Sequence, residues 1–191
     1  WVWTYFVLVQ GSKSNPHGDR RMSKIYVDEI AGIASADTVA IPGHVIQVKS
    51  TTKTDTFAMS GQTDAYVDIT GFNVSITPSS TSSKILITGH VAGGASVATS
   101  IMYRLMRDST AISVSSNGHT IRFDNEAYGT ATRGWHYTPF SFLDSPSTTS
   151  ATTYKLQIYD SSFSSSTLYV NRNGDSSTAA VSSITVMEIA G

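Results

Sequence analysis

The feature that most constrains this chain is a pattern repeated from Ile41 to the C-terminus. A short run that alternates apolar and polar residues is followed by a loop of Ser, Thr, Gly and Asn. Successive side chains of a β-strand point to opposite faces, so the run 72–77 puts its apolar side chains on one face and its polar ones on the other. The repeated pattern predicts an all-β fold, an antiparallel jelly-roll-like β-sandwich. Only residues 23–36 offer a weak candidate for a short helix.

About ten or eleven strands are expected at this spacing. The candidate runs are 44–49, 66–70, 72–76, 84–91, 101–107, 112–115, 119–123, 135–143, 154–158, 168–171 and 184–188. Runs 72–76 and 84–91 each have one apolar face, so we expect them to pair and to share one buried face. Asn117-Gly118 and Asn173-Gly174 predict two-residue hairpin turns, because both residue types tolerate the positive φ that such turns require.

Three parts are expected along the chain: an N-terminal segment at 1–21, a connector at 22–41 and the sandwich domain at 42–191. The first segment opens with a nine-residue apolar run, well short of the roughly 20 residues that span a bilayer, so no membrane insertion is predicted. A polar, basic linker follows it. Alternate residues of the apolar run would share one strand face and could attach to another subunit as an added strand: Trp1, Trp3, Tyr5, Val7 and Val9. In the alternative interpretation the natural protein begins at Met22 and residues 1–21 are an addition.

The charge balance limits the partners of this chain. It has 13 basic and 14 acidic residues, a net charge of −1, and only 14% charged residues, against about 25% in typical domains. A chain without a strong positive field does not recruit a polyanion, so nucleic acid is excluded as a partner. The absence of cysteine excludes disulfides, thiolate catalysis and the usual structural zinc sites. No cofactor, metal site or catalytic residue is predicted.

Several sequence phrases, taken in series, carry a family resemblance. They are MSKIYVDEI at 22–30, IPGHVIQV at 41–48, TTKTDTF at 51–57, YVDITG at 66–71, SITPSSTSSKILI at 75–87, YRLMRDSTAI at 103–112 and SITVMEI at 183–189. Over residues 22–191 the chain resembles a family of structural proteins of tailed bacteriophages, especially marine ones. The resemblance implies a virion location, a binding or structural role, and a sandwich that assembles as a homotrimer like the jelly rolls of the C1q and tumour-necrosis-factor type. It supplies no catalytic motif.

The densest aromatic cluster lies at 135–142 and follows a Gly-containing stretch at 128–134. Aromatic faces beside an arginine suit sugar stacking at a loop tip, so Tyr128, Arg133 and Trp135 are candidate contacts for a host surface glycan or protein. In the alternative interpretation the cluster is core, with one face of its strand in the domain and the other against a neighbouring subunit.

A second apolar face is also expected on the run 101–107. Met102 and Met106 lie opposite the face that Ile101 begins, and a strand with two apolar faces needs a second layer or another copy to cover it. Arg104 lies between the methionines and could pair with an acidic group of another copy. The candidate subunit-interface residues are Met102, Arg104, Met106, Phe140 and Phe142.

Together these patterns predict a non-enzymatic protein of the virion surface, on the tail or the head, made in the bacterial host cytoplasm. The leading hypothesis is a homotrimeric tail fibre or fibre tip that contacts the host surface and other virion proteins. The first alternative is a capsid decoration or head-fibre protein. The second is a glycan depolymerase, which would need paired acids in a groove.

Overall fold

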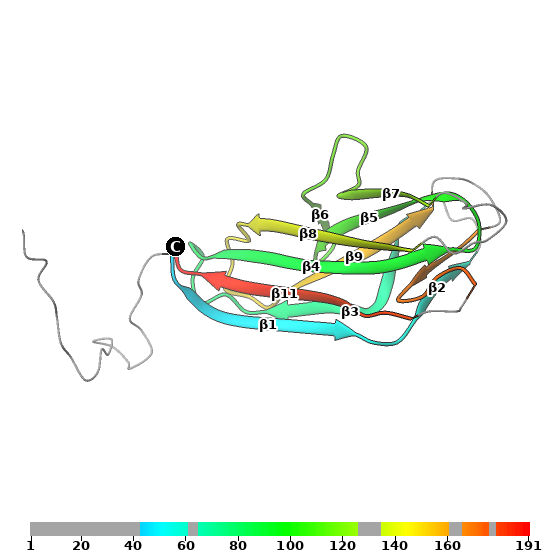
Figure 1. Cartoon of the computed structure of the whole chain (residues 1–191). Helices are drawn as coiled ribbons and strands as arrows, with labels where there is room; N and C mark the ends of the chain where they lie inside the picture. The colour runs from blue at the N-terminus through cyan, green and yellow to red at the C-terminus, as the bar shows by residue number, and fades with distance from the viewer. Residues whose placement is uncertain (1–42, 61–64, 126–134, 161–165, 176–178) are drawn as a thin grey trace, which may run out of the picture. The chain divides into compact units, whose positions relative to one another are not determined.

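A computed structural model describes residues 43–60, 65–125, 135–160, 166–175 and 179–191. Within these ranges the chain forms β-strands and no helix, and the strands build two antiparallel sheets (Figure 1). Sheet A contains β1 (Val45–Lys53), β11 (Ser182–Ile189), β4 (Lys84–Ala95), β10 (Thr167–Val170), β2 (Phe57–Ser60) and β8 (His136–Asp144). Sheet B contains β3 (Val67–Ile76), β9 (Thr152–Asp160), β5 (Thr99–Arg107), β6 (Thr110–Ile112) and β7 (Ile121–Asn125). The all-β prediction is confirmed.

The strand order is that of a jelly roll. Side by side in sheet A run β1, β11, β4 and β8, and in sheet B β3, β9, β5 and β7. The chain alternates between the two sheets from β2 to β5 and again from β7 to β10, so strands distant in sequence become neighbours, as in two interlocked Greek keys. The short strands β2 and β10 extend sheet A at the far end of β4, and β6 lies beside β5. The predicted jelly-roll-like sandwich is therefore confirmed.

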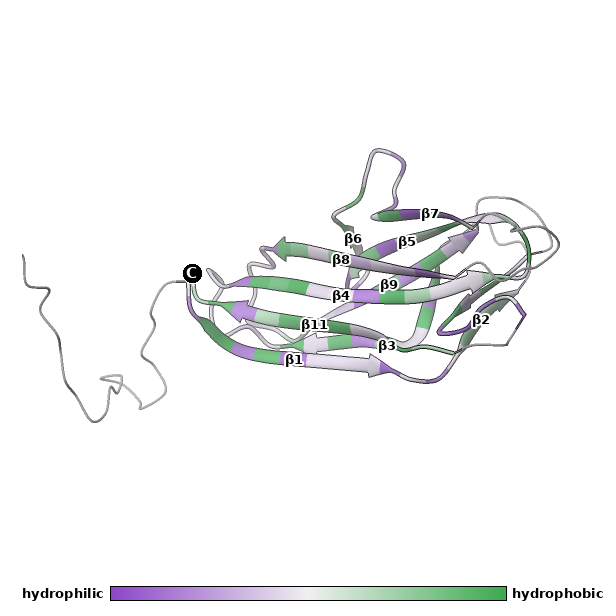
Figure 2. Cartoon of the chain, in the orientation of Figure 1, coloured by the Kyte–Doolittle hydropathy of each residue, from purple (hydrophilic) through white to green (hydrophobic). Residues whose placement is uncertain are grey.

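The core lies between the sheets and consists of the apolar side chains of alternating strand positions. Phe72, Val74 and Ile76 of β3 are buried from sheet B, and Ile85 and Ile87 of β4 are buried from sheet A. The polar residues between those of β3 are exposed, so the predicted faces of both strands are correct. Figure 2 shows the alternation of hydrophobic and hydrophilic residues along β3.

The predicted pairing of these two strands is wrong. β3 pairs with β9, whereas β4 pairs with β11 on one edge and β8 on the other. β3 and β4 belong to opposite sheets, and their apolar faces are both part of the same core. The apolar face of a strand is buried equally well beside a neighbour about 4.8 Å away or across a core about 10 Å thick, so the pattern did not distinguish the two arrangements.

The strands differ from the predicted runs in several places. Runs 66–70 and 72–76 form one strand, β3, and β2 was not predicted. Asn117 and Gly118 do lie in a turn, where the Gly118 N–H donates to the Ser115 carbonyl (2.9 Å) and Gly118 has φ +81°. They do not join a hairpin, because the strands on either side, β6 and β7, both pair with β5. Asn173-Gly174 lies in a loop that the β-bridge between Arg172 and Ala179 closes.

A buried histidine joins the two sheets. His136 of β8 is 4% exposed, and its Nε2 lies 2.9 Å from the hydroxyl oxygen of Tyr103 on β5. Phe123 of β7 stacks on the imidazole with ring centroids 4.1 Å apart. The Nδ1 atom is buried without a hydrogen-bond partner. Burial disfavours the charged imidazolium and lowers the pKa of His136 to about 4.

We expect this histidine to make the fold acid-sensitive. Its pKa is lower in the native state than the ordinary value of 6.5, so the unfolded chain binds the proton first and stability falls as the pH drops from 6.5 towards 4. The full loss is about 3 kcal/mol. Urea unfolding at several pH values across this interval gives the free energy of unfolding as a function of pH. This free energy should depend less steeply on pH for His136→Gln than for the native chain. His90→Gln, at a half-exposed position, serves as the control, and equal slopes in the native chain and His136→Gln would contradict the assignment.

Candidate interaction surfaces

The outer face of sheet B carries charged groups that are paired within the chain. Lys155 of β9 donates to Asp68 of β3 (2.6 Å), and Gln157 Nε2 donates to the same carboxylate (2.8 Å). Arg104 of β5 donates from Nη2 to Gln157 Oε1 (2.6 Å). Hydrogen bonds from Lys155 and Gln157 outweigh partial desolvation and lower the pKa of Asp68. This face is a layer of ionic and amide contacts that link β3, β9 and β5.

Aromatic rings complete this layer beside Arg104 of β5. The Arg104 guanidinium lies 4.0 Å from the centroid of the Tyr66 ring, which stacks on Tyr159 at 5.1 Å. Met102 and Met106 are 7% and 4% exposed. The predicted second apolar face of β5 is therefore covered within the chain, because side chains of the adjacent strands enclose it, and Arg104 has its partners in its own chain.

The outer face of sheet A is different in character. We call it the sheet A face: the outward side chains of β8, β4, β11 and β1. One row across it is wholly apolar, since Leu143, Leu86, Met187 and Val48 are direct register partners on four adjacent strands. Leu143 is 54% exposed and Val48 53%. Exposed apolar side chains that form a continuous row are typical of interaction surfaces.

The next two rows of the sheet A face are polar but uncharged. Thr88 of β4 lies between Ser141 of β8 and Thr185 of β11, and Thr185 is paired with Ser50 of β1. The following row contains Pro139, His90, Ser183 and Thr52. None of the residues in these three rows is Asp, Glu, Lys or Arg. These three rows are therefore a neutral surface of hydroxyl and apolar groups, and the row that borders them holds the exposed Lys84 of β4, the register partner of Ile189.

An aromatic cluster lies at the end of this face. Tyr137 of β8 is 54% exposed, its ring centroid is 5.6 Å from that of His90, and Trp135 meets it edge-on at 6.1 Å. His90 Nε2 lies 3.1 Å from the Val181 carbonyl oxygen, and Nδ1 lies 3.2 Å from Ser183 Oγ. Trp135, one of the predicted receptor contacts, is therefore on this cluster. Tyr128 and Arg133 lie outside the described residues, and their predicted role remains a prediction.

The face of β8 that was predicted to contact another subunit, which carries Phe140 and Phe142, faces the core instead. Phe140 is 8% exposed and Phe142 packs against the core, whereas Tyr137 and Leu143 point outward. Alternation predicted that Phe140 and Phe142 share one face and that Trp135, Tyr137 and Leu143 share the other, and this is confirmed. Alternation does not decide which face is inward, and that is set by the register with β4, where Ile87 is the partner of Phe142. The subunit-interface role of the five predicted residues stays a prediction. Met102, Met106 and Phe140 expose little surface to a partner.

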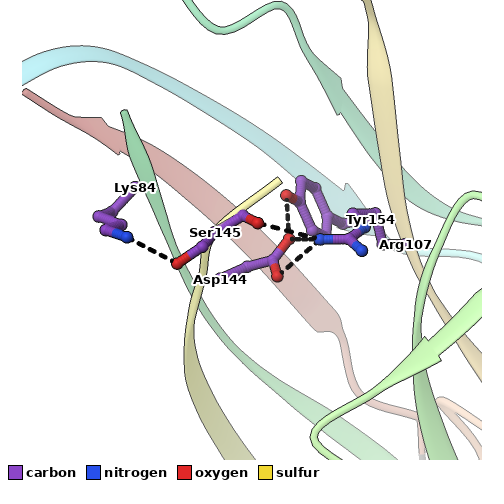
Figure 3. A network of polar contacts seen from close by, with 5 residues as sticks. All are labelled: Lys84, Arg107, Asp144, Ser145 and Tyr154. Atoms are coloured by element: carbon purple, nitrogen blue, oxygen red, sulfur yellow. Dashed lines mark hydrogen bonds and ion pairs between the residues drawn. The ribbon is translucent and has the colours of Figure 1, made fainter. Parts of the chain in front are cut away.

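A buried polar cluster at the end of β8 joins the sheets (Figure 3). Asp144 is 5% exposed and accepts hydrogen bonds from Arg107 Nη1 of β5 at 2.9 and 3.0 Å. The Tyr154 hydroxyl of β9 donates to the same carboxylate at 2.7 Å. Burial and this carboxylate raise the pKa of Tyr154. Nearby, Lys84 of β4 donates to Ser145 Oγ (2.8 Å). These hydrogen bonds fix Asp144 in position and link the two sheets.

Removing this carboxylate should destabilise the sandwich. We expect Asp144→Ala to lower the free energy of unfolding by about 3 kcal/mol, because it leaves the Arg107 guanidinium and the Tyr154 hydroxyl without their acceptor. Tyr154→Phe should cost about 1 kcal/mol. Lys84→Ala removes only an exposed hydrogen bond and should change stability by less than about 0.5 kcal/mol. Chemical denaturation measures all three, and a neutral Asp144→Ala would refute the structural role.

The described residues contain no group of three or more His, Asp or Glu that could hold a metal ion. Within the same ranges no helix is long and apolar enough to cross a membrane. The predicted attachment residues Trp1, Trp3, Tyr5, Val7 and Val9 lie outside the described residues, so their role also remains a prediction.

No family model matches the chain, and no curated protein matches it. Solved structures with some likeness include the VP2 subviral particle of infectious bursal disease virus, at 17% identity and a TM-score of 0.37, covering 74% of this chain and 40% of that one. A mutant VP2 of the same virus, from T=1 particles, has 15% identity and a TM-score of 0.38 and covers 89% of this chain and 41% of that one. This chain spans less than half the length of either. At these TM-scores the likeness does not bear on function, and the jelly-roll assignment rests on the strand order.

Proposed function

We propose that this chain is a structural protein of a tailed-phage virion, a homotrimeric tail fibre or fibre tip that contacts the host surface without catalysing a reaction. The single observation that carries the proposal is the sheet A face, with its apolar row and its two uncharged polar rows. A rigid sandwich that offers such a face to other proteins is suited to assembly. The phrases shared with phage structural proteins over residues 22–191 support the virion location.

Host contact is proposed for the aromatic end of the sheet A face. Trp135 and the half-exposed Tyr137 lie at the start of β8, directly after the 126–134 segment that contains Tyr128 and Arg133. Aromatic rings stack on the apolar faces of sugar rings, and neighbouring hydroxyls offer hydrogen bonds to a neutral glycan. In a homotrimer each weak contact would be repeated three times, and avidity would raise the overall affinity.

The proposal is tested by locating the protein on particles. Purified virions of the phage that encodes the chain are labelled with gold-conjugated antibodies against residues 43–191 and imaged by electron microscopy. We expect label at the tail tip. Label spread over the capsid would replace the fibre by a decoration protein, and the absence of the chain from the particles by mass spectrometry would overturn the virion role.

A second measurement tests the host contact. Fluorescently labelled protein should bind host cells, and Tyr137→Ser should reduce the binding at least tenfold, because it removes the most exposed ring of the cluster. Val114→Ser, which shortens an exposed side chain away from the sheet A face, is the matched control. Equal binding by the native protein and Tyr137→Ser would place host contact elsewhere.

A further inference from the structure

We infer that the apolar row of the sheet A face is a contact between copies of this chain. The inference rests on the proposed function, since it names the partner of the same face: a second copy, which meets the row formed by Leu143, Leu86, Met187 and Val48. This contact differs in place from the β5 residues that the sequence suggested.

The exposure of the apolar row indicates that a partner covers it in the assembled protein. In the single chain Leu143 and Val48, at the two ends of the row, each expose more than half of their surface, 54% and 53%. Val45, paired with Ile189 in the adjacent row, is 46% exposed, and the same row holds Lys84, the other register partner of Ile189. Several of the largest exposed apolar side chains of the described residues therefore lie on one face, whose outer strands β1 and β8 are the edges of this part of sheet A.

The lack of charge in three rows of the sheet A face is compatible with a like surface as the partner. A face that meets its own copy brings equal charges together, so a charged face repels itself unless its charges alternate to match. The three rows of the sheet A face hold no Asp, Glu, Lys or Arg, and the interior of protein interfaces is depleted in charge in the same way. The sheet B face, with Arg104, Lys155 and Asp68, lacks this neutrality.

The polar rows add hydrogen-bonding capacity without charge. Thr88, Ser141 and Thr185 lie at the centre of the face, and hydroxyls both donate and accept, so the same row is complementary to itself. His90 is held in place through Val181 and Ser183. The surface is therefore preorganised, which reduces the conformational entropy lost on association.

The size of the face is sufficient for a specific contact within an assembly. Four strands spaced by about 4.8 Å, each about nine residues long at about 3.3 Å per residue, cover an area of roughly 550 Å² per copy. Two copies would bury about 1,100 Å², close to the lower end of stable interfaces. The contact would thus be of moderate strength and would gain from the further contacts of a particle.

Sedimentation velocity of the full chain tests the inference. The native protein should sediment as an oligomer at micromolar concentration, and Leu143→Asp and Val48→Asp should each return it to the 20.5 kDa monomer or raise the dissociation constant at least tenfold. Both side chains are more than half exposed, so neither variant should unfold, and circular dichroism and thermal unfolding verify this. The control is Val114→Asp, at a 39% exposed site outside the row, which should leave the oligomer intact.

The outcomes separate this contact from the proposed function. A native chain that is monomeric at 100 times that concentration, or variants that remain oligomeric while folded, would overturn the inference. A trimer that both variants dissociate supports the proposed homotrimer but overturns the like-surface contact, because a threefold assembly joins two different patches of each copy. A dimer that both variants dissociate supports the inference and corrects the homotrimer, while the virion role is decided independently by the gold labelling.

Discussion

Burial of the inward faces of two stacked sheets is the interaction on which the rest of this structure depends. β4 shows it most directly, because it is paired on both edges and places Ile85, Ile87 and Val91 in the core at 0% exposure. Strand geometry then leaves no freedom for the side chains in between. Once Ile85 and Ile87 face inward, Leu86 must face outward, and the register of β8 and β11 lines it up with Leu143 and Met187. The surface row is a consequence of the core.

Hydrogen-bonded carboxylates fix the strands near the ends of the core. Glu188 occupies an inward position of β11, is fully buried, and accepts hydrogen bonds from Ser79, Ser83 and Gln47. Burial opposes its ionisation, yet these donors outweigh the desolvation and keep its pKa below the ordinary value. Asp144 plays the same part at the end of β8. Part of the hydroxyl-rich composition thus serves to stabilise a buried carboxylate in its charged form through hydrogen bonds, rather than to solvate loops.

The sequence predicted strands and faces well and predicted neighbours poorly. Phe72, Val74 and Ile76 were correctly assigned to one buried face because a period of two is set by the backbone alone. The pairing of β3 with β4 was wrong, as was the hairpin at Asn117-Gly118, because local turns do not determine which distant strand completes a sheet. The same reason explains the candidate surface: Met102 and Met106 have the apolar parity of an interface, but the structure places Tyr159 and Lys155 of the distant strand β9 beside them.

By itself, therefore, the sequence determined the fold class, most of the strands, the residues that share each strand face, and a nearly neutral, cysteine-free chain without a field for polyanions. Only the tertiary structure decided which face of each strand is inward and which strands lie side by side. The physical reason is that alternation is a local property of the backbone, whereas a row such as Leu143, Leu86, Met187 and Val48 exists only after four strands from distant parts of the chain are brought into register.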